Sequence, residues 1–222
     1  MTVKPFVSIH TDYLSELSDF EAEFADQLAL GTDAQNLLFR DARTPNTFTD
    51  EPVSEEQIQA IFELAKWGPT AMNIQPLRIV LVRSPEAREQ LVAAMADGNK
   101  DKTRSAPLVA ILAADTDFHE ELGKVFPHNP AAKERFAADE ASREKMSRMN
   151  AALQIGYFIV AVRAAGFAAG PMGGFDATAV EKQFYPDGKH RAMLVVNIGK
   201  PGENAFRDRL PRLDYDEVVS TV

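Results

Sequence analysis

Residues 142–165, SREKMSRMNAALQIGYFIVAVRAA, form the longest helical pattern in the sequence. The first half of this pattern is charged on one side, whereas the second half is apolar nearly all round, and Gly166 ends it. A helix that is apolar on every side is buried on every side. We therefore expect this helix to lie in the middle of the fold or in a large subunit interface.

Shorter patterns flank this helix in the sequence. Runs rich in β-branched residues predict buried strands over residues 78–83, 108–113 and 193–198. Helices are predicted over residues 33–41, 54–67, 84–98 and 177–184. Residues 117–141 are predicted to form a surface excursion with a short helix, and residues 166–176 a glycine-rich connection. Few strands separated by helices indicate an α+β or α/β layered protein.

The helix that begins after Ser54 has a clear start signal. Ser54 is an N-cap residue, and Gln57 three positions later completes a capping box. Gly68 and Pro69 end the helix. The face that we expect to be buried consists of Ile58, Ile61, Phe62 and Ala65.

The composition limits the chemistry that the chain can perform. It has no cysteine, and 24 basic against 33 acidic residues give a formal net charge of −9. Disulfides, thiolate metal sites, iron–sulfur clusters and a cysteine nucleophile are therefore excluded. The four histidines are scattered without metal-ligand spacing, and the acidic charge argues against nonspecific nucleic-acid binding. Any redox chemistry must come from a bound cofactor.

Residues 1–33 are expected to form an N-terminal helical extension, and residues 34–222 the main domain. The N-terminus lacks the pattern of a signal peptide, and the longest charge-free apolar stretch, residues 149–162, is shorter than a bilayer requires. We therefore expect a cytoplasmic, soluble protein without a membrane partner. Apolar residues at helical spacing in the extension are Leu14, Leu17, Phe20, Phe24 and Leu28.

The loop WGPTAMNIQP, residues 67–76, is a candidate binding loop. Asn73 and Gln75 lie between two prolines that fix the backbone, after one helix and before a strand. Polar side chains held rigidly at such a junction suit the rim of a planar heterocycle. A tight helix-to-strand turn without a ligand is the alternative. The chain has no nucleophile elbow, P-loop or G-x-G-x-x-G motif, so a site must be built from loops.

Three cation-bearing segments are candidates for binding a phosphate monoester, because guanidinium groups donate paired hydrogen bonds to phosphate. They are residues 43–48, RTPNTF; residues 98–102, GNKDK; and residues 207–212, RDRLPR. Taken singly, each of these segments also fits a solvated surface patch.

Five blocks, read in order, match a family pattern. They are RTPNTF (43–48), GPTAMNIQP (68–76), GNKDK (98–102), GPMGGF (170–175) and RDRLP (207–211). Together they resemble the FMN-dependent nitroreductase family. The extended match looks most like its malonic semialdehyde reductase branch, the NADH dehydrogenase/NAD(P)H nitroreductase group, and covers about residues 36–220.

The resemblance implies an α+β, three-layer fold with a central, mostly antiparallel sheet flanked by helices. It also implies an intertwined homodimer with an exchanged C-terminal arm, in which both chains build each site. Residues 151–165 would then form the dimer core, and the C-terminal tail, which carries little core signal, would be the exchanged arm.

The resemblance also assigns roles in holding FMN. The phosphate would be bound by Arg43, Arg207 and Arg209, with hydrogen bonds from Thr44 and Asn46. The ring and ribityl chain would be lined from the other subunit by Pro69, Thr70 and Asn73. The N1 and C2-carbonyl side of the ring would face Asn99 and Lys102, and the region near N5 would meet Pro171, Met172, Gly173 and Gly174.

The activity implied is that of an FMN-dependent NAD(P)H oxidoreductase, with NADH or NADPH as donor and ping-pong hydride transfer. No side chain is assigned as catalytic, so catalysis would depend on positioning and electrostatics. The branch implies malonic semialdehyde as the acceptor, reduced to 3-hydroxypropionate. Nitroaromatics or quinones are the alternative acceptors, and Arg40 or Arg104 is a candidate for holding a substrate carboxylate. A flavin-binding module without turnover and a domain without a cofactor are the rival functions.

Overall fold

The computed structural model describes residues 27–222, which divide after Ala42 into two compact units. Most of the N-terminal helix predicted from Leu14 onward lies outside the described residues, and the division predicted at residue 33 stays a prediction. In the first unit, the helix predicted over 33–41 is present as α2 (Thr32–Gln35) followed by a π-helix, η1 (Asn36–Arg40).

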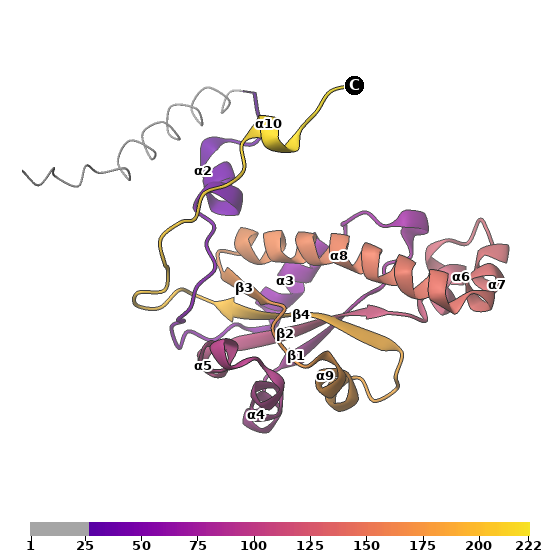
Figure 1. Cartoon of the computed structure of the whole chain (residues 1–222), viewed down its shortest axis with the longest axis horizontal. Coiled ribbons are helices and arrows are strands. Elements are labelled where there is room, and N and C mark those ends of the chain that lie inside the picture. Colours follow the sequence, from indigo (N-terminus) through magenta and orange to yellow (C-terminus); the bar gives the residue numbers. More distant parts are fainter. Residues whose placement is uncertain (1–26) are drawn as a thin grey trace, which may run out of the picture. The chain divides into compact units, whose positions relative to one another are not determined.

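The second unit is built on a four-stranded sheet in the order β1-β2-β4-β3 (Figure 1). Its strands are β1 (Leu77–Val82), β2 (Leu108–Asp115), β3 (Ala168–Met172) and β4 (His190–Gly199), and all neighbouring pairs are antiparallel. β2 is buried along its whole length, as its apolar sequence predicts. The antiparallel sheet of the expected fold class is thereby confirmed.

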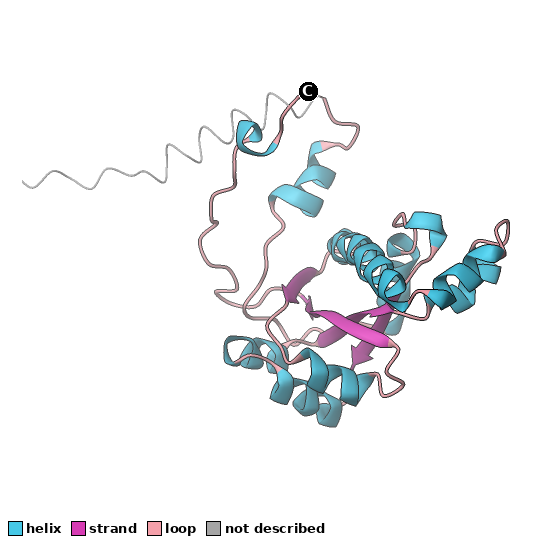
Figure 2. Cartoon of the chain, turned by 45° about the vertical axis from the view of Figure 1, so that its right-hand side comes forward, coloured by secondary structure: helices cyan, strands magenta, loops and turns pink. Residues whose placement is uncertain are grey.

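Two layers of helices cover the sheet, as Figure 2 shows. One layer contains α3 (Glu55–Ala65) and α8 (Glu140–Ala164), and the other contains α4 (Pro85–Ala94), α5 (Asp97–Ser105) and α9 (Ala177–Phe184). Each layer shares its own apolar cluster with the sheet, one that includes Phe158 and one that includes Leu91. The three-layer α+β architecture is the predicted one.

Strand β3 corrects the prediction that residues 166–176 form only a connection. Gly170 and Pro171 disfavour a strand, and Pro171 is tolerated because β3 is an edge strand paired only with β4. A Cβ on Gly170 would lie in ordinary van der Waals contact, 3.4 Å from the Asn197 Cβ and 3.5 Å from the Phe48 ring, so the close packing around it does not itself require glycine.

Strand β1 was expected to be buried, but it is the other edge of the sheet. Only Val82 is fully buried, and the preceding five residues are half-buried. A continuous apolar run is therefore no proof of a central strand.

The capping box of α3 is confirmed, because Ser54 Oγ accepts from the Gln57 N–H and Gln57 Oε1 accepts from the Ser54 N–H. Phe62 corrects the predicted buried face, since it is 51% exposed while Ile58, Ile61 and Ala65 are buried. Apolar periodicity alone did not distinguish a core position from an exposed apolar one.

The helix predicted over 84–98 is two helices. α4 ends at Ala94, and Met95 adopts an extended conformation that forms an isolated bridge with Phe175. The Ala96 N–H then donates to the Gly174 carbonyl at 2.9 Å before α5 begins. The break brings the start of α5 against the chain that follows β3.

The excursion over residues 117–141 contains more structure than the single short helix predicted. It comprises η3 (Phe118–Glu121), α6 (Leu122–Val125) and α7 (Ala131–Ala138). Phe118, Leu122 and Phe136 form a small apolar core together with Ile74 from the loop before β1. The excursion is therefore packed against that loop.

Helix α8 is buried on one side only within a single chain. Ile155, Phe158 and Val162 face the core, whereas Leu153 and Tyr157 are about half exposed. The burial on every side that we expected is not supplied by one chain. No helix within residues 27–222 is long and apolar enough to cross a membrane.

Arg88 connects α4, β1 and α5, and it provides a first test of the fold. Its guanidinium donates to the carbonyls of Val82, Thr103 and Ala106 and so caps the C-terminal end of α5. Burial lowers the pKa of Arg88 from its usual value. We expect Arg88→Met to lower the free energy of unfolding by about 1–2 kcal/mol in urea titrations, because charged hydrogen bonds are lost.

The matched control is Arg104→Met, a surface arginine that pairs with Glu89 and Asp101. We expect this substitution to leave the urea midpoint nearly unchanged, because exposed ion pairs contribute little. Equal midpoints for the two variants would contradict the role given to Arg88.

Candidate functional site

The segment that carries Arg43 is paired with the segment that carries Arg207. The Asn46 N–H donates to the Ala205 carbonyl at 2.8 Å, the Gly202 N–H donates to the Thr47 carbonyl at 3.0 Å, and Arg43 Nη2 donates to the Arg207 carbonyl. The Arg43 guanidinium also lies 5.5 Å from the centre of the Phe206 ring. Two of the predicted phosphate-binding arginines, 164 residues apart, are thus brought together.

Thr44 and Asn46 lie in the same segment, and Arg209 follows Arg207 along the exposed C-terminal chain. The Asn46 side-chain amide is directed to the Ala205 carbonyl at 3.4 Å. The pairing of the two segments therefore gathers polar and cationic groups from both ends of the unit's sequence.

A second group forms where α5 meets the end of β3. Asn99 Nδ2 donates to the Gly174 carbonyl at 3.0 Å, and Thr103 Oγ1 contacts Met172 Sδ at 3.8 Å. Asn197 Nδ2 donates to the Lys102 carbonyl at 3.0 Å. The predicted residues Asn99, Lys102, Pro171, Met172, Gly173 and Gly174 are therefore neighbours.

Gly173 and Gly174 differ in the space around them. A Cβ on Gly174 would lie 2.8 Å from Asn99 Nδ2, whereas a Cβ on Gly173 would meet nothing within 4 Å. Gly173 therefore leaves an open surface next to the fixed Asn99–Gly174 contact. Such a surface lets a ligand approach the backbone closely.

The Arg43–Arg207 group and the Asn99–Lys102 group adjoin each other. Gly170 pairs with Asn197 across β3 and β4, and the Phe48 ring lies 3.5 Å from where a Gly170 Cβ would be. Asn197 is buried, and its Oδ1 has no hydrogen-bond partner among residues 27–222. Phe48 and Asn197 therefore join the Arg43–Arg207 group to the Asn99–Lys102 group.

The third predicted group, Pro69, Thr70 and Asn73, lies in the loop before β1. Met72, Asn73 and Gln75 adopt left-handed conformations with φ of 53°, 52° and 42°. Non-glycine residues in this region are strained, and such strain concentrates at functional sites. The loop is therefore held in an unusual backbone conformation.

Helix α8 holds this loop in place. Asn150 Oδ1 accepts from the Ala71 N–H at 2.7 Å, and Gln154 Oε1 accepts from the Leu77 N–H at 2.9 Å. Both side chains are buried. Within the loop, the Gln75 N–H donates to Thr70 Oγ1 at 3.3 Å.

The sequence analysis did not assign functional roles to Asn150, Gln154 or Asn197. A signal existed for the first two, because they are polar residues four positions apart in an otherwise apolar helix, and such a pair shares one helix face. Asn197 had a weaker signal, a single amide in an apolar strand.

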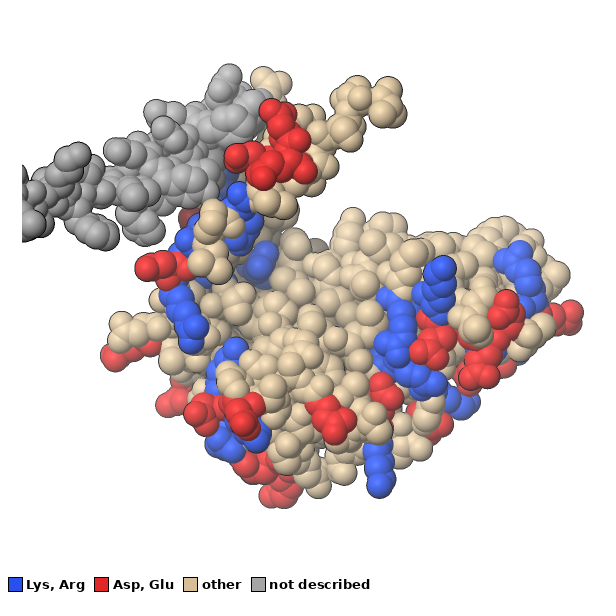
Figure 3. Space-filling model, in the orientation of Figure 1, with Lys and Arg blue, Asp and Glu red and all other residues tan. Residues whose placement is uncertain are grey.

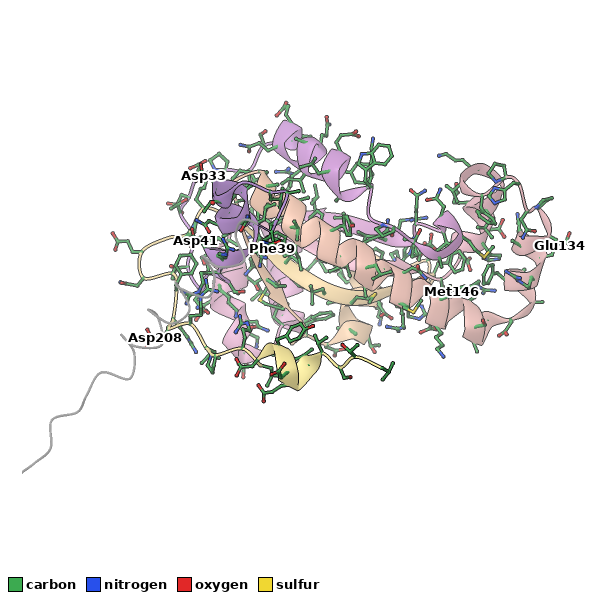
Figure 4. All side chains as sticks on the ribbon, turned by 90° about the horizontal axis from the view of Figure 1, so that it is seen from above. Asp33, Phe39, Asp41, Glu134, Met146 and Asp208 are labelled. Carbon is green, nitrogen blue, oxygen red and sulfur yellow. The ribbon has the colours of Figure 1, made fainter. Side chains whose placement is uncertain are left out.

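One chain does not bring the loop of Asn73 to the other two groups. The loop leads into β1 and the second group follows β3, and these strands are opposite edges of the sheet. Three strand spacings separate them, roughly 14 Å. Figure 4 likewise shows Asp208, next to Arg207, and Glu134, in the helix α7 packed near the loop, at opposite ends of the unit.

Charges around these groups are mixed. Figure 3 shows Lys and Arg side chains interspersed with Asp and Glu on the face drawn.

Arg104, a candidate for binding a substrate carboxylate, pairs with Glu89 at 2.9 Å and Asp101 at 3.2 Å, and these partners hold its pKa above the usual value. Lys102 is half-buried and has no ion-pair partner within residues 27–222. No group of three or more His, Asp or Glu in that range could hold a metal ion.

A pocket of about 420 Å³ adjoins the loop of Asn73 on the β1 side. Gln75, Leu77 and Gln154 line it together with the exposed Phe62 of α3. The anchoring residue Gln154 therefore faces the pocket as well as the loop.

Sequence comparison identifies relatives of this chain. The sequence model of the "Nitroreductase family" matches residues 40–200. A protein of Streptomyces coelicolor named "Putative NADH dehydrogenase/NAD(P)H nitroreductase" is 62% identical over 195 residues, which are 88% of this chain and 99% of the relative. A protein of the same name from Leptothrix cholodnii is 50% identical over 87% of this chain and 98% of its own length.

Solved structures with this fold agree with the sequence match. A "Nitroreductase Family Protein" from Streptococcus pneumoniae superposes with a TM-score of 0.72 at 23% identity, over 83% of this chain and 98% of that one. A "putative nitroreductase in complex with FMN" from Exiguobacterium sibiricum superposes with a TM-score of 0.73 at 16% identity, over 86% and 98%. These structures show the same fold, and the extent of the family match together with the identity to the relatives shows that the chain belongs to the nitroreductase family.

Proposed function

We propose that the protein is an FMN-dependent NAD(P)H oxidoreductase that reduces a small aldehyde acid, malonic semialdehyde, to 3-hydroxypropionate. The observation that carries the proposal is the joined pair of groups built around Arg43–Arg207 and Asn99–Lys102 in a chain of this family. The relatives' name supports NAD(P)H as the electron donor. The choice of acceptor derives from the sequence blocks that resemble the malonic semialdehyde reductase branch.

The residues present fit FMN. The Arg43 guanidinium lies against the backbone of Arg207 at one end of the joined groups, and guanidinium groups carried by these two residues would suit a phosphate dianion. Lys102 has no carboxylate partner in the described part of the chain, and Asn99 and open space at Gly173 lie beside it. Along the joined groups, the polar side chains thus change from the arginines that would bind the phosphate to the amide of Asn99, which would face the ring.

The chemistry that FMN would supply when bound is hydride transfer from NAD(P)H to the acceptor. The chain's own residues bind and orient the reactants. Lys102 places positive charge on the side where negative charge develops on reduction, which is a preorganised electrostatic stabilisation. Donor and acceptor would use the same face in turn, so the kinetics would be ping-pong.

We infer a homodimer in which the loop of Thr70 and Asn73 serves the partner's cofactor. Two observations support this. The loop and the phosphate group are apart in one chain, and α8 leaves Met149, Leu153 and Tyr157 exposed, a row of apolar side chains that a second copy would cover. Residues 206–222 are also exposed throughout, as an arm that packs on a partner would be.

A broad nitroreductase or quinone reductase is the alternative, since the relatives' name includes nitroreductase. The open space at Gly173 favours it, because an uncrowded surface accepts flat acceptors of several shapes.

The test is anaerobic addition of NADH or NADPH to FMN-loaded protein, followed by malonic semialdehyde or a nitrofuran in parallel. We expect the yellow absorbance to bleach with the nucleotide and to return with the aldehyde acid. Recovery with the nitrofuran alone would replace the proposed acceptor by the alternative. A yellow protein that neither nucleotide bleaches would be a flavin-binding module, and a protein that takes up no FMN would contradict the whole proposal.

A further inference from the structure

Arg135, on helix α7, lies beside the strained loop that carries Asn73. Its Nη2 contacts Met72 Sδ at 3.5 Å, and its guanidinium carbon lies 5.1 Å from the centre of the Phe136 ring. A thioether sulfur is a weak acceptor, and a guanidinium has five N–H donors. Most of the hydrogen-bonding capacity of Arg135 is therefore available to a ligand.

Arg135 differs in its pairing from Arg78 and from Lys133, the other cation of α7. Arg78 pairs with Asp115 at 2.6 Å, and Lys133 pairs with Glu120 at 2.6 Å. Within residues 27–222, by contrast, Arg135 has no carboxylate partner. A guanidinium left without an acid, in a chain with a net charge of −9, is an anion-binding group.

The position of Arg135 is fixed relative to Asn73. Phe136, its neighbour on α7, packs with Phe118 and Ile74 in the small core of the excursion, with ring centres of Phe118 and Phe136 5.2 Å apart. Asn73 Nδ2 donates to the Val125 carbonyl at 2.8 Å. Arg135 therefore lies beside Asn73 in whichever subunit's site Asn73 serves.

We propose that Arg135 binds the carboxylate of the electron acceptor and so selects acids over neutral molecules of the same shape. The inference rests on the proposed function, because it places the acceptor next to the loop of Asn73. A planar guanidinium binds a carboxylate through two parallel hydrogen bonds, which orients the acid as well as holding it. Arg104, the other candidate in this unit, already pairs with two acids.

The test compares Arg135→Gln with Lys133→Gln in the FMN-loaded protein. Both substitutions remove one positive charge from α7, but the Lys133 ammonium is paired with Glu120. The acceptors are 4-nitrobenzoate and 4-nitrobenzamide, which differ in charge but hardly in shape. For Arg135→Gln we expect kcat/KM with nitrobenzoate to fall roughly 10- to 100-fold, mainly through KM, and kcat/KM with the amide to stay within about twofold.

We expect Lys133→Gln to change neither value and Arg135→Lys to recover part of the loss. An equal loss with both acceptors, no loss with nitrobenzoate, or a rise confined to the KM of NAD(P)H would overturn the assignment. If the unsubstituted protein reduces only malonic semialdehyde, the same variants are compared with that acid, and kcat/KM should fall in Arg135→Gln alone. If it reduces neither the nitro compounds nor malonic semialdehyde, the proposed function fails. In that case calorimetric titration with malonate still decides on Arg135, because binding should be lost in Arg135→Gln and kept in Lys133→Gln.

Discussion

Arg207→Ala is expected to weaken FMN binding roughly 10- to 100-fold, the loss of one charged hydrogen-bonding partner of a phosphate. Arg43→Ala should weaken it at least as much. Its guanidinium would contribute to the phosphate site directly, and it also donates to the Arg207 carbonyl, which holds the second arginine in place. Titrating apoprotein with FMN and following the quenching of flavin fluorescence measures both dissociation constants.

Arg212→Ala is the matched control in the same C-terminal cluster. Its guanidinium donates to the carbonyls of its own neighbours, Leu210 and Pro211. We expect FMN affinity close to that of the unsubstituted protein. Equal weakening by Arg212→Ala and Arg207→Ala would indicate a general effect of charge and would contradict a specific phosphate site.

Gly202→Ala should destabilise the protein by roughly 2–3 kcal/mol, near the upper end for overpacking. A Cβ on Gly202 would lie 2.9–3.1 Å from the backbone O, C and N of Phe48, and backbone atoms cannot turn aside as a flexible side chain can. The two paired segments would have to separate. Because they carry Arg43 and Arg207, we expect FMN retention to fall together with the melting temperature.

Gly123→Ala provides the comparison for Gly202→Ala. A Cβ on Gly123 meets nothing within 4 Å, and the residue lies in helix α6, where alanine is favoured over glycine. Thermal melts followed by circular dichroism should show no loss for this variant. A Gly202→Ala protein as stable as Gly123→Ala would mean that the segments are paired more loosely than the structure indicates.

Local signals predicted those parts of the fold that local interactions form. The capping box at Ser54, helix α9 and the apolar strand β2 needed only neighbouring residues, and they were predicted correctly. Helix α5 has no apolar periodicity, and only Thr103 among its residues is buried. Contacts from Arg88 and Asn197, distant in sequence, hold it, so no local pattern could reveal it.

The sequence blocks identified the residues of the candidate site but not the contacts that hold these residues together. The Arg43–Arg207 and Asn99–Gly174 contacts join positions 164 and 75 residues apart, which the order of blocks alone cannot place. The roles of all these residues toward FMN, including Pro69, Thr70 and Asn73 from a partner, remain predictions, and the FMN titration addresses those of Arg43 and Arg207.

The left-handed loop also determines which positions can be varied to change the acceptor. Branched side chains are costly at φ near 50°, so residues 72, 73 and 75 admit little beyond glycine, asparagine and unbranched residues. The Val125 carbonyl oxygen accepts the hydrogen bond from Asn73, so a change of the Val125 side chain leaves this hydrogen bond in place. A library that aims at new acceptors should therefore leave the loop and the buried core residues constant and diversify the exposed positions of α6 and α7.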